Sequence, residues 1–158
     1  MDEDYFNYEM PEWDRNRFSS EDDEGEAWKM QPQWDAVEKL YDHCREIFKL
    51  CHLLNESISG EWAESSRSMI MANTSIIGAK IVGAESGNLY ILRMENAAII
   101  RLNMIELRHQ LIMLNELQPD LNPYCQHILA EIEKFKQQFK VWISFFKNDE
   151  FEDDWGLF

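Results

Sequence analysis

Apolar side chains recur at intervals of three and four residues near the end of the chain, which is the spacing of one buried helical face. The positions are Cys125, Ile128, Ile132, Phe135, Phe139, Trp142 and Phe146. Asn122 and Pro123 come just before them, as an N-cap and a proline at the first helical position would. A helix that is apolar on one face must bury that face against other elements.

Three earlier segments also have helical patterns. The stretch D-A-V-E predicts a capped start at Asp35 for a first helix that ends near position 54. A second helix is expected over about 61–84 and a third over about 88–117, with Ser86 as a candidate N-cap for the third. Short connections between four helices predict an all-α, up-down four-helix bundle.

The third helix is apolar on nearly all sides, which is typical of a helix central in a bundle or pressed against another subunit. We therefore expect a homo-oligomer. Arg93, Arg101 and Arg108 lie roughly on one side of this helix, either as a clamp for an acidic partner such as another subunit's tail, or paired with nearby glutamates. Asn96 and Asn103 lie on an apolar stripe and are candidates for buried polar residues that fix helix register.

The net charge of -15 is concentrated at the two ends. Residues 1–30 hold eleven acids and three bases, residues 148–158 hold five acids and no base, and residues 31–147 are nearly neutral at -2. These ranges predict an acidic, aromatic tail, a helical body and an acidic C-terminal tail. The tails would repel a phosphate backbone, so we expect no direct nucleic-acid binding and favour a protein partner with a basic or aromatic-accepting groove.

The sequence gives several indications of environment. We see no apolar run long enough to cross a membrane and no secretory signal at the start. Cys44, Cys51 and Cys125 lie within apolar helical patterns, which favours reduced, buried thiols in a cytoplasmic protein over a disulfide framework.

One motif suggests metal chemistry. Glu106 and His109 form an E-x-x-H pair, the pattern that di-iron carboxylate bundles repeat on two helices. No second pair at this spacing follows, so we expect no metal, no cofactor and no enzymatic activity, and interpret the two residues as surface groups. A carboxylate-metal enzyme using this pair, and an acidic mimic of nucleic acid, are the alternatives.

The chain ends with acids and large apolar side chains, E-F-E-D-D-W-G-L-F. Asp153, Asp154, Leu157 and Phe158 resemble in kind the acidic tip of bacterial single-stranded DNA-binding proteins, although Trp155 and the following glycine depart from that pattern. The resemblance implies that the acids meet basic residues of a partner and the last ring enters a pocket. The same apolar end also resembles sliding-clamp-binding peptides. The alternative is that these rings fold back onto the protein's own bundle.

A wider stretch, about 34–146, resembles small bacterial four-helix-bundle proteins first met as products of ribosomal intervening sequences. The resemblance lies in Ser75-Ile76, in a glycine ending the second helix, and in a third helix that finishes with Glu106-Leu107. It implies a helical bundle, often in ring-forming oligomers, and extends to uncharacterised bacterial proteins. Together these features predict an oligomeric interaction or scaffold protein that binds its partner through its tails.

Overall fold

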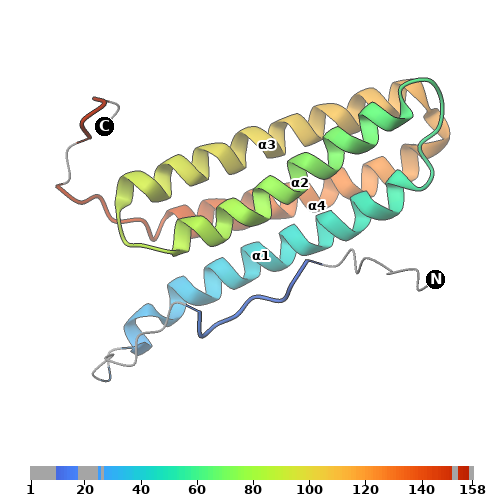
Figure 1. Ribbon diagram of the computed structural model, residues 1–158. Coiled ribbons are helices and arrows are strands. Elements are labelled where there is room, and N and C mark those ends of the chain that lie inside the picture. Colours follow the sequence, from blue (N-terminus) through green and yellow to red (C-terminus); the bar gives the residue numbers. More distant parts are fainter. Residues whose placement is uncertain (1–9, 18–24, 26, 151–152, 157–158) are drawn as a thin grey trace, which may run out of the picture.

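The computed structural model describes residues 10–17, 25, 27–150 and 153–156 and consists of four long helices. Their bounds are α1 Ala27–Asn55, α2 Ala63–Glu85, α3 Tyr90–Leu117 and α4 Asn122–Ile143, with a 3-10 turn at Pro119–Leu121. Each helix packs against the helices before and after it in the chain, and α4 closes the ring against α1 (Figure 1). The predicted all-α four-helix bundle is confirmed, and this part of the chain contains no strand.

The core forms where the helical faces meet. On α4 the predicted face is correct: its first four positions and Trp142 are buried, and Phe139 and Phe146 are partly buried against them. α3 buries only part of the apolar stripe that carries Asn96 and Asn103, because Leu107 and Leu114 are buried whereas Leu89 and Leu92 are exposed. The buried face is formed by Ala97, Ile100, Met104, Leu107, Leu111 and Leu114. A helix that is apolar all round offers several faces, and packing against α2 and α4 selects one of them.

Three predicted helix caps are wrong. α1 begins at Ala27, so the predicted tail boundary at position 30 lies inside the helix, and Asp35 accepts a hydrogen bond from Gln31 within it at 2.8 Å. Ser86 follows the end of α2, where its hydroxyl donates to the carbonyl of Gly83 at 2.7 Å. Asn122 is already helical, with φ -52° and ψ -45°. The starts of α1 and α4 extend beyond their best sequence signals, whereas α3 begins later than its signal, at Tyr90.

The N-terminal segment 10–17 packs on the bundle rather than extending away from it. Arg45 donates from Nε to the carbonyl of Met10 at 3.2 Å, and the ring centroids of Trp13 and Tyr41 lie 5.1 Å apart. Arg15 pairs with Glu38. This part of the predicted acidic tail therefore binds its own α1, and Trp13 does so as a partly buried ring.

Gly83 provides a test of the α2–α3 contact. A Cβ at this position would meet the amide oxygen of Asn96 at 3.4 Å, an ordinary contact. Because glycine costs a helix interior about 1 kcal/mol relative to alanine, Gly83→Ala is expected to stabilise the protein by about 0.5–1 kcal/mol in urea unfolding. Gly60→Ala is the opposing control, since φ there is +100° and alanine would be strained. A loss of stability in Gly83→Ala would show that the side chain of Asn96 cannot move to make room for the added methyl group.

None of the helices in the described residues is both long enough and apolar enough to cross a bilayer.

Candidate functional site

The C-terminal tip lies beyond the end of the bundle where α2 meets α3 (Figure 1). Asp153 organises it as a turn: its carbonyl accepts from the N–H of Gly156 at 2.9 Å, and its side chain accepts from the N–H of Trp155 at 3.2 Å. Gly156 has a φ of +69°, which suits glycine at this position. Trp155 is 89% exposed, so this ring does not take the alternative position, folded back onto the bundle. Leu157 and Phe158 lie outside the described residues.

Asp149 attaches the connection between α4 and the tip to the bundle. The carboxylate of Asp149 accepts a hydrogen bond from the backbone N–H of Tyr90 at 2.9 Å. Tyr90 is the first residue of α3, whose first N–H groups have no partner within the helix. An anion at a helix N-terminus is also favoured by the helix dipole. The tip therefore leaves the bundle from the N-terminal end of α3, with Asp154 exposed beside Trp155.

A buried polar network lies close to the N-terminal end of α3, where the tip leaves the bundle. Trp142 donates from its indole N–H to one carboxylate oxygen of Glu85 at 2.8 Å, and Arg93 approaches the other oxygen at 3.4 Å. The guanidinium of Arg93 also lies 5.3 Å from the ring centre of Phe146. In the amide orientation that satisfies both groups, the oxygen of Gln33 accepts from both terminal nitrogens of Arg93 at 2.7 and 2.8 Å. The network joins α1, α2, α3 and α4.

Because Arg93 belongs to this network, it does not join Arg101 and Arg108 in an arginine clamp. Arg93 is only 7% exposed and its partner is Glu85, not one of the glutamates near it on α3. Burial raises the pKa of Glu85, and the charge of Arg93 and the Trp142 hydrogen bond oppose that shift. The carboxylate therefore depends on Arg93 for its charged form. Sequence reasoning missed Glu85, because nothing in its spacing distinguishes it from an exposed acid at a helix end.

Arg101 and Arg108 both lie on the exposed side of α3 that faces α4. They border a groove of about 630 Å³ between the two helices, and Lys136 and Lys140 border it from α4. Neither arginine forms an ion pair within the described part of the chain, although Lys136 pairs with Glu133 at 2.6 Å. The positions of the two lysines in the sequence put them off the apolar face of α4, but nothing in the sequence indicates that they face the arginines.

Within the described part of the chain, the asparagines on α3 form hydrogen bonds in their own helix and none across to a neighbouring helix. Asn96 donates to the carbonyl of Leu92 at 2.7 Å, and Asn103 donates to that of Ile99 at 2.9 Å, both within α3. Each side chain is half-buried. Bonds to the carbonyl four residues earlier satisfy the amide locally, so these residues specify no partner helix.

The metal-site candidates lie apart from other ligands. Glu106 and His109 are both exposed on α3. Among the described residues there is no group of three or more histidine, cysteine, aspartate and glutamate side chains that could hold a metal ion. All three cysteines are buried free thiols, as predicted, and burial raises the pKa of Cys44 to about 12. A thiol with that pKa is inert as a nucleophile near neutral pH.

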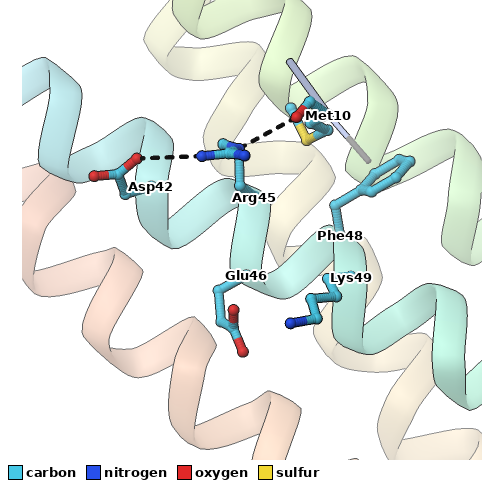
Figure 2. Close-up of a pocket in the computed structure, with 6 residues that line it drawn as sticks. All are labelled: Met10, Asp42, Arg45, Glu46, Phe48 and Lys49. Carbon is cyan, nitrogen blue, oxygen red and sulfur yellow. Dashed lines mark hydrogen bonds and ion pairs between the residues drawn. The ribbon is translucent and has the colours of Figure 1, made fainter. Parts of the chain in front are cut away.

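A second, smaller hollow lies where the N-terminal segment crosses α1. Figure 2 shows Asp42, Arg45, Glu46, Phe48 and Lys49 projecting from α1, with Met10 beside Arg45. These residues line a space of about 400 Å³. Arg45 points toward both the Met10 carbonyl and the Asp42 carboxylate, the latter at 4.0 Å. The charged side chains that line this hollow are of mixed sign and none is buried. We therefore interpret the hollow as the place where Met10 packs on α1.

Comparisons with models of known protein families, with curated proteins and with solved structures found no match, so the resemblances drawn from the sequence stay predictions.

Proposed function

We propose that this protein is an interaction or scaffold protein that binds a protein partner through its acidic, aromatic C-terminal tip. The observation that carries the proposal is the exposure of Trp155, a large ring at 89% that sits between Asp154 and a glycine in a hydrogen-bonded turn. A tryptophan offers much apolar contact area and commonly anchors protein interfaces. The acids beside it would steer it to a basic groove and select against acidic surfaces.

The bundle supports this role as a rigid base for the tip. Asp149 holds the start of the tail on α3, and the buried network beneath it ties the four helices together. The tip is therefore presented at a defined end of the molecule. The N-terminal segment plays a different part in the proposal, because Met10 and Trp13 are used within the chain. We also propose that the protein works in the cytoplasm, consistent with its three free thiols.

The test is affinity capture from native lysate with full-length chains. The wild-type chain is compared with Trp155→Ala and with a chain ending at Asp154, and captured proteins are quantified at low and high salt. We expect one or a few proteins to be lost from both variants, and to weaken with salt in the wild type because charged residues contribute to recognition.

Trp28→Ala is the matched control, since Trp28 is also strongly exposed, at 71%, but lies at the start of α1. It should leave the captured set unchanged. If the wild type, Trp155→Ala and Trp28→Ala all capture the same proteins, the tip is not the binding element and the proposal is wrong.

A further inference from the structure

The groove between α3 and α4 is apolar inside and positively charged at its edges. Met104 and Ile105 of α3, together with Leu129, Phe135 and Phe139 of α4, supply its floor. Its charged border carries Arg101, Arg108, Lys136 and Lys140 against the single acid Glu133, a net charge of +3. The rest of the chain is strongly acidic, with -15 overall. The groove is therefore a local exception in charge, and it combines that positive charge with an apolar lining.

The packing of the helices explains why a groove forms here. α3 packs most extensively on α2 and least extensively on α4 among the neighbouring helix pairs of the bundle. Phe135 and Phe139 stand on α4 where it faces α3. The rings stack with centroids 6.3 Å apart. Large side chains on one wall leave a space that nothing in the described part of the chain fills.

We propose that this groove binds the C-terminal segment, residues 149–158, of a second copy of the protein. The segment carries five acids and ends in Trp155, Gly156, Leu157 and Phe158. The segment therefore matches the groove in charge and in apolar character. Its acids can pair with the four basic side chains, and its apolar side chains can pack on the apolar floor. Arg101 and Arg108 lack ion pairs in the described chain, so they are available to carboxylates. Guanidinium groups bind carboxylates in a bidentate manner.

The geometry of the tail favours a second copy over the same chain. Asp149 is fixed at Tyr90, the start of α3. At 1.5 Å per residue, Arg101 lies ~16 Å and Arg108 ~27 Å further along that helix. Trp155 follows Asp149 by six residues, which span at most ~20 Å when fully extended. Within one chain, Trp155 reaches only the near part of the groove, and in the structure this ring is 89% exposed rather than held in the groove. The tail of a second copy is tethered to another bundle, so its Trp155 can also reach the far part, near Arg108.

This inference rests on the proposed function, because it names the chain itself as a partner of the same tip. It also predicts the form of the assembly. If two copies exchange tails reciprocally, the contact closes as a two-fold dimer; if the exchange is one-directional, copies add in a ring or chain. In either case each contact pairs one tip with one groove, so the two elements can be disabled separately.

The experiment is complementation between two full-length variants, followed by sedimentation velocity. Arg101→Glu/Arg108→Glu reverses the groove charge and keeps the tip, while Trp155→Ala keeps the groove and loses the tip anchor. We expect each variant alone to associate at least about tenfold more weakly than wild type. An equimolar mixture should recover association, because intact groove and intact tip are then present on different chains.

Two controls keep the result specific. Lys39→Glu/Lys49→Glu makes the same change in net charge at exposed positions of α1, outside the groove, and should associate like wild type. A fluorescent peptide of residues 148–158 should bind the Trp155→Ala chain, and at least about tenfold more weakly the charge-reversed chain. Circular dichroism verifies that every variant is folded.

Three outcomes would overturn the inference. The first is a mixture that fails to associate. The second is an equal loss of association in the α1 control. The third is a wild-type monomer in which the peptide is excluded by the chain's own tail, which assigns the groove to the same copy. A monomer whose tip still captures other proteins from lysate would contradict this inference and leave the proposed function standing.

Discussion

Arg93→Met is expected to lower the free energy of unfolding by about 3–5 kcal/mol near neutral pH, because it leaves the carboxylate of Glu85 buried without a cation. Methionine keeps an apolar stem of similar length but supplies no charge. Glu85 is 8% exposed and, among the described residues, would retain only the Trp142 indole as a partner. The cation–π contact of Arg93 with Phe146 is lost as well. Urea unfolding followed by circular dichroism measures the effect.

The pH dependence of that loss identifies its cause. The pKa of Glu85 is raised by burial, with Arg93 opposing the shift, so removing Arg93 raises the pKa further. A carboxyl whose pKa is higher in the folded than in the unfolded state binds more protons when folded, so it lowers stability as pH rises between those two values. The deficit of Arg93→Met should therefore be largest near neutral pH and shrink as the solution is acidified toward the unfolded pKa of a glutamate.

Two further variants separate this explanation from a general effect of losing an arginine. Arg101→Met removes an exposed α3 arginine and should change stability by no more than about 0.5 kcal/mol. Glu85→Gln combined with Arg93→Met removes the stranded charge and should recover part of the loss. A deficit in Arg93→Met that is the same at acidic and neutral pH would refute the role given to Glu85.

Trp142→Ala is expected to destabilise the protein by about 3–5 kcal/mol through the cavity it leaves. The ring is fully buried and packs between Phe139 and Phe146, with centroids 5.7 and 4.7 Å away. Trp155→Ala is the natural comparison, because the same substitution at an exposed ring should change stability by no more than about 0.5 kcal/mol. Thermal or urea unfolding of the two variants gives the comparison directly.

Trp142→Phe divides the effect into packing and hydrogen bonding. Phenylalanine keeps a ring in the core but cannot donate to Glu85, so a loss of about 1–3 kcal/mol is expected from the unsatisfied carboxylate oxygen. If Trp142→Ala and Trp155→Ala cost the same, the end of α4 is not part of the cooperative core. If they differ as expected, Trp155→Ala is a clean binding variant, since any loss of partner capture then has no folding component.

The outcome on α3 shows how far apolar patterns alone can be taken. On α4, polar and apolar side chains alternate with a clear helical period, so only one face can be buried and the sequence specifies it. On α3, apolar side chains occur on most sides, and Leu92, Ile105 and Ile112 remain exposed. Such a helix can bury an apolar face in more than one rotation about its own axis. Only the neighbours, α2 on one side and α4 on the other, determine which side chains enter the core.

The candidate sites show the same contrast between what the sequence specifies and what helix packing decides. The tip was identified from the sequence, because acids and large rings at the end of a chain need no fold to be recognised. Arg101 and Arg108 were also identified, since residues seven apart lie near one another on a helix. Their meeting with Lys136 and Lys140 was not predictable, because those lysines come from a helix whose rotation and depth depend on the whole bundle.

By itself, the sequence determined the number of helices, the approximate position of their connections, the buried face of α4, the burial of the cysteines and the acidity of the ends. These are local properties, set by the period of side chains along one segment and by turn residues between segments. The tertiary structure alone decided the face of α3, the pairing of Glu85 with Arg93 and Trp142, the seating of Met10 and Trp13 on the bundle, and the charged groove. Each of these joins residues far apart in the chain, and their proximity exists only once the helices have packed.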